Sequence, residues 1–405
     1  MRIAMFTNNY KPYTGGVPIS IEHLAEALRK RGHEVYVFAP SYEGQEEEPF
    51  VIRYPSFPVK IAGAPVPNVL TTLFLKKVRE LRIDIIHVHH PAIVGNVALF
   101  IRQKTGIPVV FTYHTRYEEY LHYIMGLQAV EKRVGLIDWY LKEFCNRCDM
   151  IVAPTGGIRD YLYKKEVQVP VGIMPTGIPR DSFLADDTAV RELRQKYLGT
   201  ADFLFCTVSR LAKEKNLLFQ LEGLGRLKKM LSIVGKDFRH LIIGDGPQRK
   251  ELEEKIRALN LQENVILVGN VANSEIKNYQ AAADLFLFTS KSETQGIVLL
   301  EAMAVGTPVV AVNATGVCDI VEDGKNGYLT PEDAKNYAEH VLYLMEKKNL
   351  HQAMSCEARQ TAERYAEEAV AEQAELYYVN CIRRATAEAH VETKQPLPFL
   401  KRYMV

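Results

Sequence analysis

Short apolar runs alternate along the chain with longer segments in which apolar residues recur at helical spacing. In the first half, the runs that predict strands are RIAMFT, EVYVFA, DIIHVHH, PVVFTYH and MIVAP, beginning at residues 2, 34, 84, 108 and 150. In the second half they are FLFCTVS, HLIIG, NVILVG, DLFLFTS and PVVAV, beginning at residues 203, 240, 264, 284 and 308. Almost continuously apolar strands that alternate with helices are typical of parallel sheets covered on both faces. The sequence therefore predicts an α/β protein with two doubly wound, Rossmann-like domains.

The junction between these domains is expected in GIMPTGIPRDSF, residues 172–183, where two prolines and two glycines interrupt the periodicity. We assign residues 1–178 to an N-terminal domain and residues 179–366 to a C-terminal domain. Residues 367–405 are expected to form a helix and a tail that pack back on the N-terminal domain. Ligands of doubly wound sheets bind at the carboxyl ends of the strands, so two facing domains would hold the substrate in the cleft between them.

Composition and charge limit the kinds of partner. The chain of 405 residues is 47% hydrophobic, and 50 Lys and Arg against 49 Asp and Glu leave a net charge of +1. No overall field attracts nucleic acid, so we expect no nucleic-acid partner. The N-terminal MRIAMFTNNYKPY lacks the apolar core of a signal peptide, and no run approaches the roughly 18 apolar residues of a membrane span. We expect a cytoplasmic protein, with any membrane contact peripheral and on the inner face of the cell membrane.

Cysteine and histidine clusters do not predict a metal site. Cys145 and Cys148 form a C-x-x-C in a helical pattern without a second pair, which favours reduced core residues. In HVHHPA, strand alternation places His87 and His89 on one face and His90 on the other. No Asp, Glu or Cys follows at ligand spacing, so we interpret this cluster as a strand end near the acceptor.

Two glycine-containing loops follow predicted strands. Gly15 and Gly16 precede the first helix pattern, where the backbone could approach an anion, although any tight turn would also explain a glycine pair. GDGPQR at 244–249 has the first two glycines of a dinucleotide fingerprint, but Arg249 occupies the position of its third small residue. This substitution argues against a nicotinamide-dependent oxidoreductase.

Charged residues follow two strands of the second domain. Arg210 and Lys215 in SRLAKEKN could neutralise a diphosphate, although a solvated loop explains them equally well. Gln295, Gly296 and Ile297 form a predicted loop-to-helix turn whose N–H groups would face a phosphate.

Two glutamates flank that turn. Seven residues separate Glu293 from Glu301, which places Glu293 on the loop and Glu301 about a turn and a half into the helix. They are therefore not expected to face one bond as the acid and base of a hydrolase do. Glu301 interrupts an apolar run and would be costly to bury without a partner.

Together these motifs resemble a known enzyme family. SETQGIVLLEAMAVGTPVV is similar to the E-x7-E signature of the family-four retaining glycosyltransferases, which have the GT-B fold. YKPYTGGV, SRLAKEKN, IGDGP, VGNV and EDGKNGYL occur in the family's order, so the resemblance covers nearly the whole chain.

The resemblance implies roles for individual residues. The catalytic set is His114, Arg210, Lys215 and Glu293. The donor-binding set is Gly15, Gly16, Arg210, Lys215, Gly246, Gly269, Gln295, Gly296, Ile297 and Glu301. In the family's pattern, Glu293 contacts the donor sugar, Glu301 the ribose hydroxyls and His114 the sugar hydroxyls. The resemblance further implies retention of configuration, no metal ion and no cofactor other than the nucleotide-sugar co-substrate. The sequence also has no D-x-D metal motif.

A closer likeness concerns the acceptor. TNNYKPYTGGV, TYHTRYEEYLHY and SETQGIVLLEAMA resemble the branch that includes diacylglycerol glucosyltransferases, which use UDP-glucose and a membrane lipid. Residues 73–82 combine an apolar side with four cations, and residues 116–144 contain Tyr117, Tyr120, Tyr123, Trp139 and Tyr140, as an interfacial surface would. Both segments would equally suit ordinary surface helices. Two alternatives remain: a UDP- or GDP-sugar enzyme with another lipid or a soluble acceptor, and a non-catalytic nucleotide-sugar-binding protein.

Overall fold

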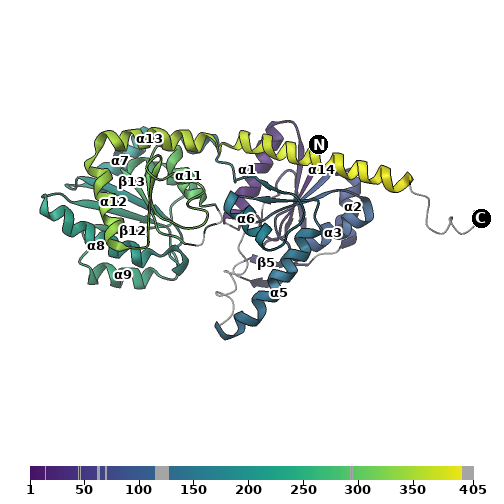
Figure 1. Ribbon diagram of the computed structural model, residues 1–405, viewed down its shortest axis with the longest axis horizontal. Coiled ribbons are helices and arrows are strands. Elements are labelled where there is room, and N and C mark those ends of the chain that lie inside the picture. Colours follow the sequence, from purple (N-terminus) through teal and green to yellow (C-terminus); the bar gives the residue numbers. More distant parts are fainter. Residues whose placement is uncertain are drawn as a thin grey trace, which may run out of the picture. The chain divides into compact units, whose positions relative to one another are not determined.

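The computed structural model divides the chain into two compact units (Figure 1). Unit 1 comprises Met1–Gly177 and the chain from Glu367 onward, and unit 2 comprises Ile178–Ala366. The structure describes residues 1–13, 15–43, 45, 47–61, 64–68, 71–114, 127–291, 293 and 295–394. The end of the predicted C-terminal tail, residues 395–405, lies outside them.

Unit 1 is built on a seven-stranded parallel sheet in the order β3-β2-β1-β6-β7-β8-β9. Its strands are β1 (Arg2–Phe6), β2 (Glu34–Pro40), β3 (Val51–Tyr54), β6 (Ile85–Val88), β7 (Val109–Thr112), β8 (Met150–Ala153) and β9 (Val171–Ile173). An antiparallel pair, β4 (Ser56–Ile61) and β5 (Ala64–Pro67), accompanies the sheet. The helices are α1 (Gly16–Lys30), α2 (Thr71–Glu80), α3 (Val94–Thr105), α5 (Leu127–Asn146), α6 (Gly156–Lys164) and α14 (Glu367–Lys394).

Unit 2 contains a six-stranded parallel sheet in the order β12-β11-β10-β13-β14-β15. Its strands are β10 (Phe203–Val208), β11 (Phe238–Ile243), β12 (Val265–Gly269), β13 (Leu285–Phe288), β14 (Val309–Val312) and β15 (Gly327–Thr330). Its helices are α7 (Asp187–Leu198), α8 (Leu217–Ile233), α9 (Arg249–Ala258), α10 (Asn273–Ala282), α11 (Ile297–Ala304), α12 (Ala334–Glu346) and α13 (Lys348–Glu363), with 3-10 turns η1 (Arg180–Phe183) and η2 (Lys213–Lys215).

The predicted α/β class with two parallel sheets is confirmed, and every apolar run predicted as a strand forms one. β3, β9 and β15 and the antiparallel pair were not predicted. β3 and β9 are the edges of the first sheet and β15 is one edge of the second, and all three are only partly buried. An edge strand buries fewer side chains than a central one, so it does not require a continuous apolar run. The fourth edge strand, β12, has such a run in NVILVG and was predicted.

Alternate side chains of β1 show how both faces of the first sheet are covered. Ala4 and Phe6 belong to a cluster with residues of α2, α3, α5 and α6, whereas Ile3 and Met5 pack with α1 and α14. From α14, the buried Tyr378 completes this second cluster, and Arg31 of α1 binds Glu375 at 2.7 Å. The C-terminal helix therefore supplies part of the core of unit 1, beside α1 (Figure 1).

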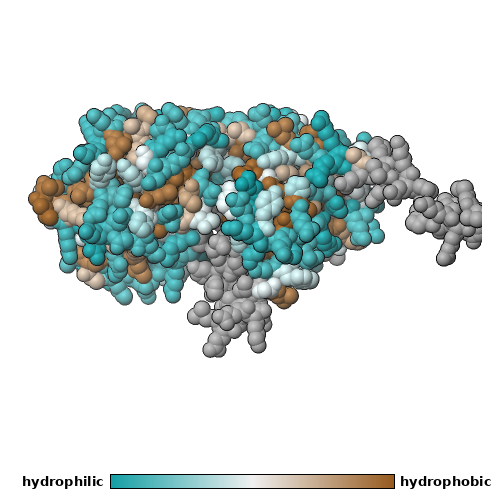
Figure 2. Space-filling view, in the orientation of Figure 1, coloured by the Kyte–Doolittle hydropathy of each residue, from teal (hydrophilic) through white to brown (hydrophobic). Residues whose placement is uncertain are grey.

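Helix α2 shows where the apolar side of the predicted interfacial segment is placed. Phe74 and Val78 are buried in the core of unit 1, while Lys76, Arg79 and Arg82 are exposed. The amphipathic pattern thus arises from core packing, and the solvent face of this segment is basic. Figure 2 shows hydrophilic side chains over most of the visible face of the described residues, with hydrophobic ones in small separate groups. Within the described part of the chain, no helix has the length and apolarity to cross a membrane.

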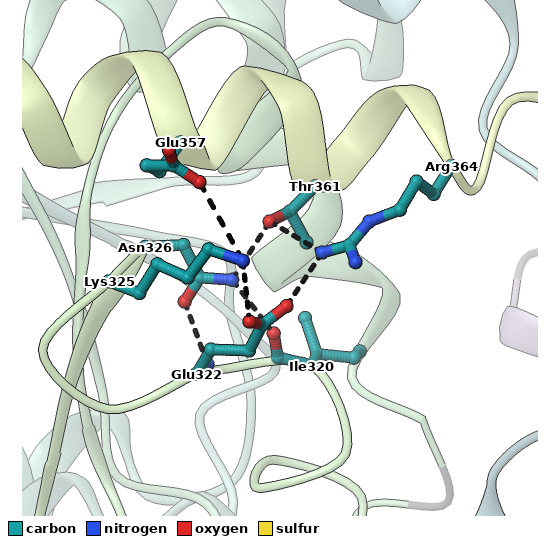
Figure 3. A network of polar contacts seen from close by, with 7 residues as sticks. All are labelled: Ile320, Glu322, Lys325, Asn326, Glu357, Thr361 and Arg364. Carbon is teal, nitrogen blue, oxygen red and sulfur yellow. Dashed lines mark hydrogen bonds and ion pairs between the residues drawn. The ribbon is translucent and has the colours of Figure 1, made fainter.

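The EDGKNGYL motif has a structural role in unit 2. Asn326 donates to the Ile320 carbonyl at 3.0 Å and to the Thr361 hydroxyl at 3.1 Å, and both groups are shown in Figure 3. Glu322 accepts from Arg364 at 2.7 Å and from Lys325 at 2.8 Å. Since Thr361 belongs to α13 and Arg364 follows it, these bonds fix the loop before β15 to that helix.

Candidate functional site

Both sheets share a topology that creates a ligand site at a defined place. In each order the direction of winding reverses once, between β1 and β6 in unit 1 and between β10 and β13 in unit 2. Crossover connections leave such a switch point on opposite sides, which opens a crevice at the carboxyl ends of the two strands. Most candidate residues follow these four strands or β7, the neighbour of β6.

In unit 2, the loops after β10 and β13 are bound to each other. Thr289 donates its hydroxyl to the Lys215 carbonyl at 3.0 Å, and Ser290 donates to the Glu214 carbonyl at 3.2 Å. Lys215 Nζ lies 2.6 Å from Oε1 of Glu293. The structure therefore brings together two predicted site residues that are 78 positions apart. Thr289 and Ser290 were not predicted, because no sequence pattern marks a hydroxyl that holds a neighbouring loop.

The second predicted cation also has a carboxylate partner. Arg210 Nη2 lies 2.6 Å from Oε1 of Glu214. The Arg210 side chain is 56% exposed, whereas that of Glu214 is 14% exposed. Glu214 was missed, although an acidic residue four positions after an arginine is a recognisable signal. An anionic ligand at this loop would compete with these carboxylates for Arg210 and Lys215.

The loop after β13 leads into the amino terminus of α11. Gly296 has φ 72°, in the left-handed region, and precedes Ile297, the first helical residue. A glycine suits this backbone because an added Cβ would be strained and would lie 3.1 Å from Leu299. Gln295 is buried beside it. The positive end of α11 provides electrostatic attraction for an anion.

Glu301 lies within α11 and remains partly exposed. Burial raises the pKa of its carboxyl from 4.5 to about 7. Desolvation is the cause, as expected for a carboxylate placed in an apolar helix. Near neutral pH the Glu301 carboxyl is therefore close to its midpoint of titration.

Close backbone packing explains the glycines of the GDGPQR loop. A Cβ on Gly244 would lie 2.1 Å from the Ser209 carbonyl oxygen, and one on Gly246 would lie 2.5 Å from that of Leu211. Gly244 also donates to the Gly269 carbonyl at 2.8 Å. Gly246 is thus required where the loop packs against the segment carrying Arg210, whether or not it contacts a ligand.

In unit 1, histidines occupy the ends of β6 and β7. His89 Nδ1 and His114 Nε2 are 2.8 Å apart. His87, on the same face as His89, has ring nitrogens 2.7 Å from the Tyr378 hydroxyl and 2.6 Å from that of Thr112. Burial lowers the pKa of His87 to about 3, and it lowers that of His89 and His114 well below the ordinary value. These rings are therefore neutral hydrogen-bonding groups at physiological pH. No group of three His, Cys, Asp or Glu residues in the described ranges is arranged to hold a metal ion.

The glycine pair after β1 has a different setting. Gly15 is the extended residue before α1, and Gly16 is its first residue. A Cβ on Gly16 would meet no described atom within 4 Å. Packing within the described part of the protein therefore gives no reason for a glycine at position 16.

The C-x-x-C is part of the unit 1 core. Cys145 and Cys148 are buried free thiols, and burial raises the pKa of both. A protonated, buried thiol is a poor nucleophile and metal ligand, so the structural interpretation of this motif is confirmed.

Part of the proposed acceptor segment can be placed. Residues 115–126 lie outside the described residues. In α5, Leu136 and Trp139 are 63% and 59% exposed. Tyr140 instead accepts from Asn96 at 2.8 Å and donates to the Pro91 carbonyl at 3.0 Å, so it anchors α5 to the body of unit 1.

Comparison with known proteins extends over both units. A family model described as Glycosyltransferase Family 4 matches residues 14–182, and one described as Glycosyl transferases group 1 matches residues 190–361. An alpha-monoglucosyldiacylglycerol synthase from Acholeplasma laidlawii is 31% identical over 94% of this chain and 98% of its own length. Another from Streptococcus pneumoniae is 33% identical over 84% of this chain and 76% of its own.

Solved structures share the fold. Anabaena Alr3699/HepE in complex with UDP aligns with a TM-score of 0.74 and 21% identity over 94% of this chain and all of its own. Sucrose-phosphate synthase from Thermosynechococcus elongatus aligns with a TM-score of 0.77 and 20% identity over 95% of this chain and 99% of its own. Both units therefore have the fold of these solved structures.

Proposed function

The chain belongs to the family-four glycosyltransferases and has their GT-B fold, and from this premise we propose that it transfers glucose from UDP-glucose to a membrane lipid such as 1,2-diacylglycerol, with retention of configuration.

The contact between Lys215 and Glu293 is the observation that carries this proposal. In a nucleotide sugar, one glycosidic oxygen joins the sugar ring to the diphosphate. A binding site therefore needs a cation for the phosphate directly beside an acceptor of hydrogen bonds for the sugar hydroxyls. Lys215 and Glu293, 2.6 Å apart at the switch point of unit 2, meet that requirement.

Chemistry would then proceed mainly through stabilisation of the leaving group. As the bond between the anomeric carbon and the phosphate oxygen breaks, negative charge grows on the diphosphate, where Arg210, Lys215 and the amides at the start of α11 stabilise it. The acceptor oxygen bonds to the same face of the anomeric carbon, and its proton passes to the departing diphosphate oxygen. His114, which follows β7 in unit 1 and is neutral, would form a hydrogen bond with a sugar hydroxyl. No protein residue needs to act as a strong base, and the charge on the leaving group is met without a metal ion.

Two observations support a membrane lipid as the acceptor: the names of similar proteins and the exposed side chains of unit 1. Two relatives that align over most of their length carry the name alpha-monoglucosyldiacylglycerol synthase, which specifies a lipid acceptor for those proteins. In this chain, Trp139 and Leu136 present apolar surface on α5, and the solvent side of α2 is basic. An exposed tryptophan and a basic helix are the groups that bind an anionic bilayer surface peripherally.

Transfer to lipid can be tested directly. Purified protein is incubated with radiolabelled UDP-glucose and anionic liposomes, with or without diacylglycerol, and label entering the organic phase is counted. We expect diacylglycerol-dependent label, and an α-linked product by proton NMR would support retention. Absence of lipid label with continued UDP-glucose hydrolysis or binding would keep the transferase function and remove the lipid acceptor. Transfer from a GDP-sugar or to a soluble sugar would instead favour the alternative acceptor and donor classes.

A further inference from the structure

A hydrogen-bonded chain of three side chains and a hydrogen-bonded pair lie next to each other at the carboxyl ends of β6 and β7. One runs from Tyr378 of α14 through His87 to Thr112, with contacts of 2.7 and 2.6 Å. The other joins His89 to His114 at 2.8 Å. The rings of His87 and His89 are in contact, with their centroids 4.3 Å apart and their planes tilted by 36°. Only His114 has a role in the proposed function, so the other members need a separate explanation.

A small cavity lies between Thr112, the last member of the chain, and the His89–His114 pair. Its volume is about 10 Å³, and its lining includes Thr112, His89 and His114 together with the hydroxyl residues Ser20 and Thr176. His89 Nε2 is buried and has no hydrogen-bond partner among the described residues. About 10 to 15 Å³ holds one water molecule when several polar groups surround it. This cavity therefore suits a single water between Thr112 and His89 Nε2.

The three-residue chain has one direction when Tyr378 is the donor to His87. Burial raises the pKa of the Tyr378 phenol, so this group keeps its proton and can donate to Nδ1 of His87. With Tyr378 as the donor, the one N–H of the neutral His87 imidazole lies on Nε2 and donates to the Thr112 oxygen. The Thr112 O–H is then free to point into the cavity.

We propose that His89 is a positioning residue for His114, and that one buried water links it to Thr112, so that hydrogen bonds run in one direction from Tyr378 to His114. The water donates to His89 Nε2, which places the proton of His89 on Nδ1. That N–H donates to Nε2 of His114, and the N–H of His114 is fixed on Nδ1, where it can donate to a hydroxyl of the substrate. The choice of a sugar hydroxyl as the final acceptor rests on the proposed function.

The tautomers test this arrangement without any substrate. In protein with 15N-labelled histidine, we expect His114 and His89 to carry the proton on Nδ1, as read from their nitrogen chemical shifts. His89→Leu removes the donor and should return His114 to the Nε2–H form that predominates in water. His89→Asn places an amide near the former Nδ1 and should retain the Nδ1–H form of His114, whereas His89→Gln should not. A wild-type His114 protonated on Nε2, or an unchanged His114 tautomer in His89→Leu, would overturn the proposal.

Transfer activity provides a second measurement. We expect kcat to fall at least tenfold in His89→Leu and His89→Gln, and less than threefold in His89→Asn. Tyr378→Phe removes only the first hydroxyl and should lower both the Nδ1–H population and kcat by a smaller factor. His240→Asn, which removes a buried histidine from unit 2, controls for loss of thermal stability. If kcat fell only in proportion to folded protein in all variants, His89 would be merely structural. Absence of transfer with the expected tautomers would contradict the proposed function and leave the positioning role intact.

Discussion

The switch points of the two sheets have the same topology but opposite chemistry. Unit 1 places neutral histidines and hydroxyls at the ends of β6 and β7, whereas unit 2 places Arg210, Lys215 and two carboxylates after β10 and β13. Neutral rings suit sugar hydroxyls, and fixed cations suit a diphosphate. Since the strand orders correspond, the difference shows that the residues after the strands, rather than the sheet, determine what each unit can recognise.

The two regions also keep their polar groups stable by different means. In unit 1, desolvation holds the histidines uncharged and hydrogen bonds join them. In unit 2, carboxylates neutralise the cations, with both ion pairs at 2.6 Å. A ligand for unit 2 must therefore replace existing ion pairs, which favours an anion of high charge such as a diphosphate.

Lys215→Ala should have the largest effect, because it removes a charge that acts on the leaving group. We expect kcat to fall by about 10²- to 10³-fold, as when one stabilising donor is removed from a charged transition state. The Kd for UDP-glucose should rise much less, since Arg210 and the start of α11 remain. Single-turnover kinetics and calorimetric titration measure the two quantities.

Lys213→Ala is the matched control, because Lys213 lies in the same turn η2 and is exposed. It should retain turnover close to that of the wild type. Equal turnover in wild type and Lys215→Ala, or an equal loss in both variants, would show that the charges of unit 2 do not act on the reaction.

Glu301 should make donor binding by unit 2 depend on pH near 7, where the histidines of unit 1 stay neutral. Its pKa is raised to about 7, so the carboxylate that would accept from ribose hydroxyls is progressively lost below pH 7. We expect the Kd for UDP-glucose to rise about tenfold for each pH unit below 7, and Glu301→Gln to bind weakly with little pH dependence. Titrations between pH 5.5 and 8 test this, and a flat wild-type profile would contradict it.

The stability of the folded protein should change with pH in the opposite direction to donor affinity. A raised folded-state pKa means that folding favours the protonated carboxyl, so stability falls as pH rises from 4.5 to 7. At pH 8, ionisation of Glu301 in the folded state lowers the free energy of unfolding by at most about 3 kcal/mol. The partial exposure of Glu301 makes the actual loss smaller. Glu301→Gln should therefore have a higher Tm than the wild type at pH 8 and the same Tm at pH 4.

The central strands could be predicted from the sequence more completely than the side-chain contacts of the candidate site. The buried strands could be predicted because burial on both faces requires a continuous apolar run. The edge strands β3, β9 and β15 could not be predicted because they lack such a run, which the fourth edge strand, β12, retains. Arg210, Lys215 and Glu293 were found through their motifs. Thr289, Ser290 and Glu214 were not, since holding a loop in place requires only a hydroxyl or a carboxylate at the right position. The contact of Tyr378 with His87 joins residues 291 positions apart and depends on how α14 packs.

Gly16 of unit 1 and Gly246 of unit 2 were both predicted to bind the donor, and their replacement by alanine should have the smallest effects. An alanine at Gly246 would place its Cβ 2.5 Å from the backbone oxygen of Leu211, so Gly246→Ala should lower unfolding stability by about 1–3 kcal/mol through overpacking. An alanine at Gly16 meets no described atom within 4 Å, so Gly16→Ala should leave Tm unchanged.

Donor binding then separates the reasons for the two glycines. If the backbone at Gly16 approaches a phosphate, the added methyl group should raise the Kd for UDP-glucose several-fold in a fully stable protein. Thermal unfolding and calorimetric titration of both variants measure this. Gly225→Ala in α8, where an added Cβ makes only ordinary contacts with Leu259 at 3.7 Å, serves as a control for replacing a glycine without overpacking. Unchanged donor affinity in Gly16→Ala would remove Gly16 from the donor site. A loss of stability there would instead mean that the loop after β1 needs its glycine for folding, as the loop after β11 does.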